Sequence, residues 1–176
     1  MKNIILIGFM GTGKTAVAKA IAKSLAMKYV STDELIEKKE GRTIAEIFSS
    51  SGEAYFRMIE KKVVEEISRV PGQVVDTGGG VVLDHENIEN LKKGGTVICL
   101  WASPETVYRR TASCRHRPLL NVEDPMRRIR ELLEYRTPFY HKADHHIHTD
   151  ADSIESVARK AEEIANGKKS DSRETK

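Results

Sequence analysis

Residues 8–15 of this 176-residue chain read GFMGTGKT and match the phosphate-binding pattern GxxxxGK[ST] at every position. An apolar run at residues 4–7 precedes them and a helical pattern over residues 15–26 follows. Glycines in such a loop let backbone N–H groups surround phosphate oxygens, and the N-terminus of the next helix adds positive potential. The Lys14 ammonium suits the β- and γ-phosphates, and the Thr15 hydroxyl suits Mg²⁺. The stretch predicts a nucleoside triphosphate site with the binding residues Gly11, Thr12, Gly13, Lys14, Thr15 and Ala16.

A second pattern overlaps the same stretch. Gly11, Gly13 and Ala16 also fit the glycine-rich fingerprint of dinucleotide-binding folds, and Asp33 lies about where a ribose-binding acid would stand. A lysine directly after the second glycine has no role in that fingerprint, and the apolar run ends at Gly8 rather than at Gly11. We therefore favour the triphosphate site.

Short apolar runs alternate with longer helical patterns along the chain. Runs typical of strands lie at residues 4–7, 29–30, 74–75, 97–101 and 146–149, and helical spacing is found over residues 15–26, 53–68, 125–135 and 153–165. Helix starts are indicated by a capping box over residues 43–46 and by proline after Ser103 and Asp124. This alternation predicts a single α/β domain over residues 1–167 with a mainly parallel sheet. Residues 168–176 lack apolar side chains, so we expect a disordered tail there.

The composition narrows the classes of function. The 29 Lys and Arg against 26 Asp and Glu give a net charge of +3, which argues against a dedicated nucleic-acid binder. No segment approaches the ~20 apolar residues of a membrane helix, and the first apolar run is too short for a signal peptide. We therefore expect a cytoplasmic protein that does not bind membranes. Cys99 and Cys114 form no CxxC pair, so zinc or dithiol chemistry is not expected, and Cys99 is predicted to lie in the core.

Four further features fall at predicted strand ends or near helix ends. They are Asp33, Arg57, the glycine triplet at residues 78–80, and Arg136. Ligands of open α/β sheets bind outside the carboxyl ends of the strands, so Asp33 and the triplet are expected to face the phosphate loop. Two arginines suit a carboxylate, an aspartate suits a hydroxyl, and successive glycines allow close backbone approach of a ring. The predicted acceptor is a small hydroxylated carboxylic acid.

These segments in this order resemble the shikimate kinase family. The resemblance covers residue 3 to about residue 165, and it is carried by residues 8–15, 32–37, 41–48, Gly52, Glu53, Phe56, Arg57, Glu60, residues 78–80, residues 117–120, Tyr135, Arg136, Pro138 and Tyr140. It implies a three-layer P-loop kinase sandwich, like nucleoside monophosphate kinases, with a five-stranded parallel sheet in the order 2-3-1-4-5, flanking helices and a lid. It also implies ATP-dependent, Mg²⁺-assisted phosphorylation of the 3-hydroxyl of shikimate, in aromatic amino-acid (chorismate) biosynthesis. We expect the protein to be a monomer.

The resemblance implies roles for individual residues. Lys14, Asp33 and Arg117 would be catalytic, with Asp33 nearest the attacking hydroxyl. Arg57 and Arg136 would hold the carboxylate of shikimate. The other substrate contacts would come from Gly78, Gly79, Gly80, Phe48, Phe56, Glu60, Pro118 and Leu119, with Glu60 orienting Arg57.

Plainer interpretations exist for the same side chains taken singly. Asp33 could cap the helix that begins there, and Arg57 could be a solvated helix residue. Phe48 and Phe56 could belong to the hydrophobic core. The glycine triplet is harder to explain in this way, because glycines cost backbone entropy without contributing packing.

Four arginines and a histidine lie between residues 109 and 118. Mobile cations that close over a transferring phosphate stabilise its charge and exclude water, so we predict a lid at about residues 112–123. The resemblance implies that Arg110 approaches the nucleotide and that Arg117 contacts both substrates. The alternative is a basic surface loop or a weak RNA contact.

One position departs from the family pattern. Shikimate kinases usually carry an Asp-x-Asp pair where this chain has Ser31-Thr32-Asp33, so the first acid is missing. Asp76 ends the predicted third strand, where other P-loop enzymes place a carboxylate that binds Mg²⁺. Our hypothesis is that Asp76 supplies, through water, the charge that Ser31 lacks. The equally weighted alternative is a turn residue bonded to nearby backbone.

Two other functions are considered. A related small-molecule kinase, such as one for gluconate, would use the same phosphate loop. A non-catalytic nucleotide-binding regulator is conceivable because of Ser31, although the presence of Lys14, Thr15, Asp33 and Arg117 argues against it.

Overall fold

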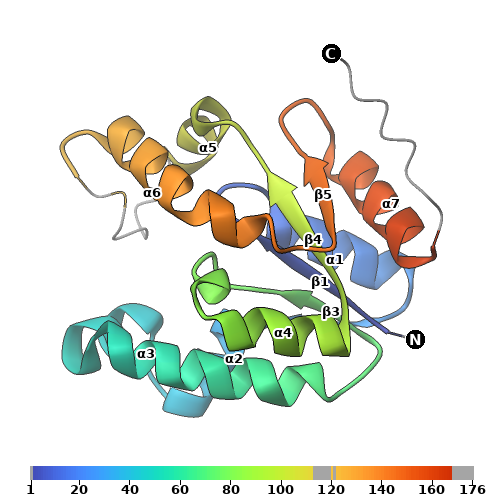
Figure 1. Cartoon of the computed structure of the whole chain (residues 1–176), viewed down its shortest axis with the longest axis horizontal. Helices are drawn as coiled ribbons and strands as arrows, with labels where there is room; N and C mark the ends of the chain where they lie inside the picture. Colours follow the sequence, from blue (N-terminus) through green and yellow to red (C-terminus); the bar gives the residue numbers. More distant parts are fainter. Residues whose placement is uncertain (1, 113–119, 121, 168–176) are drawn as a thin grey trace.

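The computed structural model describes residues 2–112, 120 and 122–167 and shows a parallel sheet between two layers of helices (Figure 1). The strands are β1 (Asn3–Gly8), β2 (Lys28–Ser31), β3 (Gln73–Asp76), β4 (Gly95–Trp101) and β5 (His145–His148). The helices are α1 (Lys14–Ser24), α2 (Thr32–Glu40), α3 (Ile44–Ser68), α4 (His85–Gly94), α5 (Pro104–Thr111), α6 (Pro125–Tyr140), α7 (Ile154–Ala165) and the 3-10 turn η1 (Val81–Leu83). The strand order is β2-β3-β1-β4-β5 and every pairing is parallel, which confirms the predicted topology.

The central strand β1 is buried on both faces, as a parallel sheet covered by helices requires. Ile4 and Leu6 pack into a core with α1 and α7, whereas Ile5 and Ile7 pack into the larger core formed with α2 to α6. Cys99 of β4 is fully buried in the larger core, as predicted. Both faces of the sheet are therefore packed against helices, and the loops at its carboxyl edge extend from these buried strands.

Several element bounds differ from the expectation. The helix predicted over residues 53–68 is the second half of α3, which begins at Ile44 after the predicted capping box and bends at Gly52 (φ 81°). Helix α6 continues to Tyr140 rather than ending at residue 135. It contains Pro138, and its last turns carry the buried Arg136 and Tyr140. Helix α4 was not predicted, because it buries only two apolar side chains, Ile88 and Leu91, and its other residues are mostly polar.

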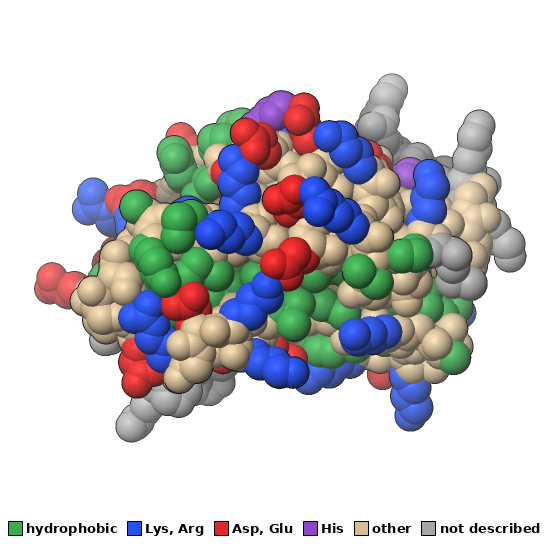
Figure 2. Space-filling model, turned by 90° about the horizontal axis from the view of Figure 1, so that it is seen from below, with side chains coloured by type: hydrophobic (Ala, Val, Ile, Leu, Met, Phe, Trp, Pro, Cys, Tyr) green, Lys and Arg blue, Asp and Glu red, His purple; other side chains and the backbone are tan. Residues whose placement is uncertain are grey.

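The surface carries charges of both signs. Figure 2 shows the face seen from below, where basic and acidic side chains are interspersed rather than separated into one basic patch. Pairs such as Lys39–Glu66 and Lys61–Glu86 contribute to this pattern. In the described part of the chain, no helix has both the length and the apolar character needed to cross a membrane.

Candidate active site

The phosphate loop connects β1 to α1 at the carboxyl edge of the sheet. β1 ends at Gly8, as the triphosphate interpretation requires, and Gly13 starts α1 in a left-handed conformation (φ 94°). The Phe9 carbonyl accepts hydrogen bonds from Lys14 Nζ (3.0 Å) and Thr12 Oγ1 (2.8 Å). Both of these side-chain hydrogen bonds therefore end on the Phe9 carbonyl. The N-terminus of α1 is directed at the space where an anion would bind.

A cavity of about 390 Å³ joins this loop to Asp33, Gly78 and Gly79, whereas the predicted acceptor residues Arg57 and Arg136 lie outside its lining. It is lined by Gly11, residues 13–16, Asp33, Asp76, residues 77–79 and Arg110. The phosphate loop and the acceptor side therefore open into the same space. This is the arrangement required for transfer of a group between two bound molecules.

Asp76 is the last residue of β3, and its side chain turns toward the phosphate loop. Its Oδ2 accepts a hydrogen bond from Thr15 Oγ1 at 2.6 Å and one from the Tyr29 hydroxyl at 3.3 Å. Burial and the nearby carboxylates of Asp76 and Glu34 raise the pKa of Tyr29 to about 12. Asp76 is therefore bonded to side chains of the site, and the alternative of a turn residue bonded to nearby backbone is wrong.

Asp33 lies in the first turn of α2, close to the glycine triplet. The helix is capped by Ser31, whose Oγ accepts from the Glu34 amide at 3.3 Å, so the interpretation of Asp33 as the cap is wrong. Burial raises the pKa of the Asp33 carboxyl, although the charge of Lys14 opposes this. A carboxyl with a raised pKa is better suited to accept a proton than an ordinary aspartate.

The glycine triplet makes room for two of these side chains. A Cβ at Gly78 would lie 2.7 Å from Asp33 Oδ1, and one at Gly80 would lie 2.5 Å from Arg57 Nη2. A Cβ at Gly79 would make only ordinary contacts, the nearest at 3.5 Å from the Gly8 carbonyl oxygen. Two of the three glycines are thus explained by side chains of the protein itself that pack against them.

Arg57 projects from α3 over Gly80. Its Nη1 donates to Glu60 Oε2 at 2.7 Å, and its Nε and Nη2 donate to Glu53 Oε1 at 3.3 and 3.1 Å. Glu60 is buried, burial raises the pKa of its carboxyl while the charge of Arg57 opposes this, and its Oε1 has no hydrogen-bond partner. Glu60 therefore holds Arg57 in place, and the solvated interpretation of this arginine is wrong.

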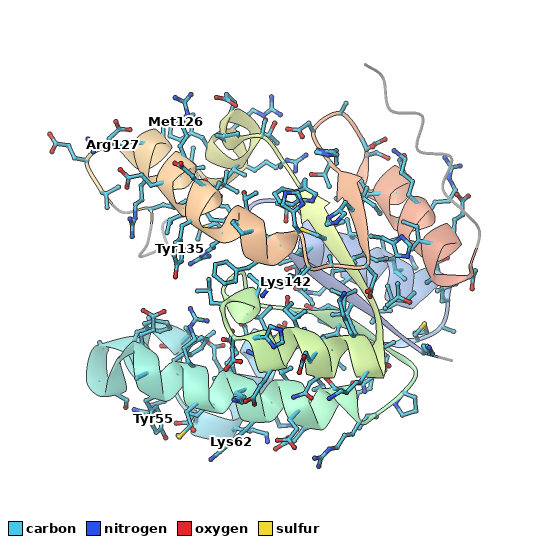
Figure 3. The ribbon with its side chains drawn as sticks, viewed as in Figure 1. Tyr55, Lys62, Met126, Arg127, Tyr135 and Lys142 are labelled. Carbon is cyan, nitrogen blue, oxygen red and sulfur yellow. The ribbon has the colours of Figure 1, made fainter. Side chains whose placement is uncertain are left out.

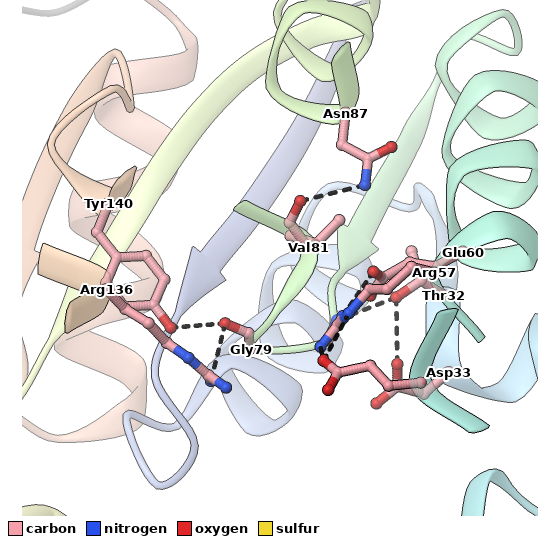
Figure 4. A network of polar contacts seen from close by, with 11 residues as sticks. Thr32, Asp33, Arg57, Glu60, Gly79, Val81, Asn87, Arg136 and Tyr140 are labelled. Carbon is pink, nitrogen blue, oxygen red and sulfur yellow. Dashed lines mark hydrogen bonds and ion pairs between the residues drawn. The ribbon is translucent and has the colours of Figure 1, made fainter. Parts of the chain in front are cut away.

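Arg136 approaches the triplet from the opposite side, as Figure 4 shows. Its Nη1 and the Tyr140 hydroxyl both donate to the Gly79 carbonyl, at 3.3 and 2.7 Å. The buried Arg136 Nε has no partner, and the guanidinium lies over the Phe9 ring with Cζ 5.6 Å from its centroid. The two arginines thus flank the glycine segment beside the cavity, with hydrogen-bonding capacity unused on Arg136.

The remaining predicted residues fall into three groups. Phe56 is buried in the core, whereas Phe48 is 36% exposed, with the two ring centroids 4.7 Å apart. Arg110 joins the phosphate loop to the chain after β5, donating to the carbonyls of Gly11 (3.3 Å) and Thr149 (2.7 Å). Arg117, Pro118 and Leu119, most of the predicted lid at 112–123, Cys114 and the tail at 168–176 lie outside the described residues.

Sequence reasoning did not assign a role to three residues that the structure brings to the site. Tyr29 contacts Asp76, Tyr140 contacts the Gly79 carbonyl, and Glu53 contacts Arg57. Glu53 stands four residues before Arg57, a spacing that brings side chains together on a helix and so gave a detectable signal. Tyr29 and Tyr140 reach their partners across separate elements, so no local pattern indicated their contacts.

Comparisons with known proteins agree with this geometry. The family model described as shikimate kinase matches residues 10–166. The shikimate kinase of Caldanaerobacter subterraneus is 52% identical over 158 residues, which cover 90% of this chain and 92% of that protein. The structure of the Acinetobacter baumannii shikimate kinase in complex with shikimate superposes with a TM-score of 0.90 at 36% identity, covering 96% and 95% of the two chains.

A more distant similarity concerns the fold alone. A gluconokinase from Sinorhizobium meliloti superposes with a TM-score of 0.60 at 16% identity, covering 94% of each chain. This similarity confirms a shared architecture and says nothing about the acceptor. The family model and the close relative lead to one conclusion: this chain belongs to the shikimate kinase family.

Proposed function

We propose that this protein transfers the γ-phosphate of ATP to the 3-hydroxyl of shikimate, a step of aromatic amino-acid biosynthesis. The observation that carries the proposal is that one cavity is lined by Lys14, Thr15 and Asp33, with Arg57 and Arg136 on either side of the glycine segment. Membership of the shikimate kinase family and the Acinetobacter baumannii relative, described as a complex with shikimate, support the same acceptor. We place the enzyme in the cytoplasm, as a monomer that acts without nucleic-acid or membrane partners.

On the acceptor side, Arg57 and Arg136 bind the carboxylate of shikimate. The unpartnered Nε of Arg136 gains a partner when this anion binds, which favours binding because a buried unpaired donor is costly. Asp33 accepts a hydrogen bond from the attacking hydroxyl and takes its proton, a role that its raised pKa suits. We assign the apolar side of the ring to Phe48, and the family resemblance implies the same role for Pro118 and Leu119.

On the donor side, Lys14 and the loop amides bind the phosphates and stabilise the charge that spreads during transfer. Arg110 lies at the nucleotide end, and Arg117 acts on the transferring phosphate. Thr15 and, through water, Asp76 would supply the oxygen ligands that Mg²⁺ prefers, and Thr15 Oγ1 lies 2.6 Å from Asp76 Oδ2. The ion held by these two residues would supply positive charge that neutralises part of the charge of the phosphates.

The test is an assay of ADP release by the purified protein with shikimate, with gluconate and without an acceptor. We expect ADP release that depends on shikimate, with formation of shikimate 3-phosphate verified by mass spectrometry. Release that depends on gluconate would identify the related sugar-acid kinase instead. ATP binding without release under any condition would identify a regulator.

A further inference from the structure

The Tyr29 side chain connects the edge strand β2 to the metal side of the phosphate loop. Its ring lies beside α1, where Lys19 Nζ is 5.1 Å from the ring centroid. Its hydroxyl reaches Asp76 Oδ2 at 3.3 Å, the same oxygen that accepts from Thr15 Oγ1. Thr15 and Lys19 are one turn apart on α1, so the tyrosine ring lies along one face of that helix and ends at the Asp76 carboxylate.

The sheet register explains why this contact matters for Asp76. Ser31 of β2 is the direct partner of Asp76 in β3, and its hydroxyl caps α2 by accepting from the Glu34 amide. The edge strand thus places a neutral side chain beside Asp76, so Asp76 is the acidic residue of this cross-strand pair. Rotation about the Cβ–Cγ bond would move Oδ2 away from its donors, so a second donor on this oxygen restricts the carboxylate further than one donor does.

We infer that Tyr29 is a positioning residue that holds Asp76 in the orientation needed for the hydrated metal ion next to Thr15. This inference rests on the proposed function, in which Asp76 supplies the carboxylate of the Mg²⁺ site. With its hydrogen donated to Asp76, the Thr15 hydroxyl keeps its oxygen lone pairs for a cation. Tyr29 is not among the residues that line the cavity, and it acts on the metal side through Asp76.

The experiment measures Mn²⁺, used in place of Mg²⁺, by electron paramagnetic resonance in the presence of ADP. The variants are Tyr29→Phe, Asp76→Asn and the double substitution. The control is Tyr55→Phe, because the Tyr55 hydroxyl also bonds a carboxylate, Glu40, but on the side of α3 away from α6 (Figure 3). Binding of ADP without metal, measured by calorimetry, shows that each variant folds and retains the phosphate loop.

We expect Tyr29→Phe to weaken Mn²⁺ binding in the ADP complex roughly fivefold, the effect of losing one hydrogen bond. Metal-free ADP affinity should be unchanged, and Tyr55→Phe should match the parent protein. In the Asp76→Asn background, Tyr29→Phe should add less than about twofold, because neighbouring residues that act through one another are not additive.

Two results would overturn the inference. The first is a parent-like Mn²⁺ affinity in Tyr29→Phe together with weakened binding in Asp76→Asn. It would show that Asp76 contributes to metal binding and that Tyr29 is not needed to position it. A full fivefold loss on adding Tyr29→Phe to Asp76→Asn would show that the tyrosine acts by another route. Failure of the proposed function is seen separately, as absence of shikimate-dependent ADP release by the parent protein.

Discussion

The donor side and the acceptor side of the cavity are built in different ways. The donor side comes from consecutive residues between β1 and α1, and the bonds that close it end on one backbone carbonyl, that of Phe9. The acceptor side is assembled from α2, α3, the glycine segment and α6, and it is held by side-chain contacts such as Arg57–Glu60. A local sequence pattern therefore describes the phosphate loop, to which the tertiary fold adds Asp76 and Arg110, whereas the whole acceptor side depends on the tertiary fold.

This difference predicts distinct consequences of mutation. Changes on the donor side should lower kcat, because its groups act on charge that develops during transfer. Changes on the acceptor side should raise the KM for shikimate, because those groups bind a carboxylate that does not react. Mutations that affect the opposite parameter would contradict the division into two sides.

The largest effect is expected at Lys14. Lys14→Met removes the ammonium group while keeping an unbranched side chain, and we expect kcat to fall by roughly 10³-fold. Shikimate affinity, measured by calorimetry without nucleotide, should stay within about twofold of the parent value. Lys23→Met, at an exposed position in the last turn of α1, is the matched control. A Lys14→Met variant that keeps a tenth of the parent kcat would contradict this view of the donor side.

Asp33 belongs to both sides, and Asp33→Asn should reduce kcat by roughly 10²-fold through loss of the proton acceptor. The same variant should be more stable at neutral pH. Because burial raises the pKa of Asp33, its neutral form stabilises the fold below the ordinary carboxyl pKa, and this contribution is lost as pH rises through the raised value. Urea unfolding at several pH values should show the gain of Asp33→Asn growing from acid to neutral pH. A gain that is constant with pH would exclude titration of Asp33 as its cause.

The sequence could predict the fold because its signals are local. The phosphate loop, the apolar runs and the caps at Thr43, Ser103 and Asp124 are contained in short segments, and each cap is present in the structure. Helix α4 was missed because Ile88 and Leu91 are its only buried apolar residues. The strand order came from family resemblance, since pairing between distant strands leaves no mark within one segment.

The site was predictable as a set of residue types but not as a set of contacts. Asp33, Arg57 and Arg136 stood out because charged side chains near strand and helix ends suit a polar ligand. The sequence could not predict why residues 78 and 80 are glycines, because the side chains that pack against them, Asp33 and Arg57, are distant in the chain. Likewise, Tyr140 bonds a carbonyl 61 positions earlier, a separation that no periodicity reveals.

Gly80→Ala tests the acceptor side without removing any functional group. The added Cβ would meet the guanidinium of Arg57, the end of a flexible side chain, so the fold should survive while Arg57 moves. We expect the KM for shikimate to rise roughly tenfold, the loss of one hydrogen bond to a charged group, with the KM for ATP unchanged. Gly79→Ala, whose Cβ makes ordinary contacts, should raise the KM for shikimate less. Equal effects at the two positions would contradict packing of Arg57 as the cause.

The smallest effect is expected at the edge of the donor side, where Trp101 Nε1 donates to His146 Nδ1 at 3.0 Å. Partial burial and the imidazoles of His141, His145 and His148 lower the pKa of His146, so the neutral, accepting form is favoured in the folded protein. This contribution is present above the ordinary histidine pKa and is lost as pH falls, because a protonated Nδ1 cannot accept the bond.

Trp101 is the one tryptophan of the chain, so its fluorescence reports the change directly. The Trp101 carbonyl also accepts from Thr149, which in turn accepts from Arg110, and loosening this edge should therefore affect nucleotide binding. We expect the KM for ATP to rise by about twofold as His146 is protonated, the effect of one exposed hydrogen bond. His146→Gln keeps an acceptor and should abolish the fluorescence titration, whereas His145→Gln should preserve it. A titration that persists in His146→Gln would assign the signal to another group and remove this link between the sheet edge and the donor side.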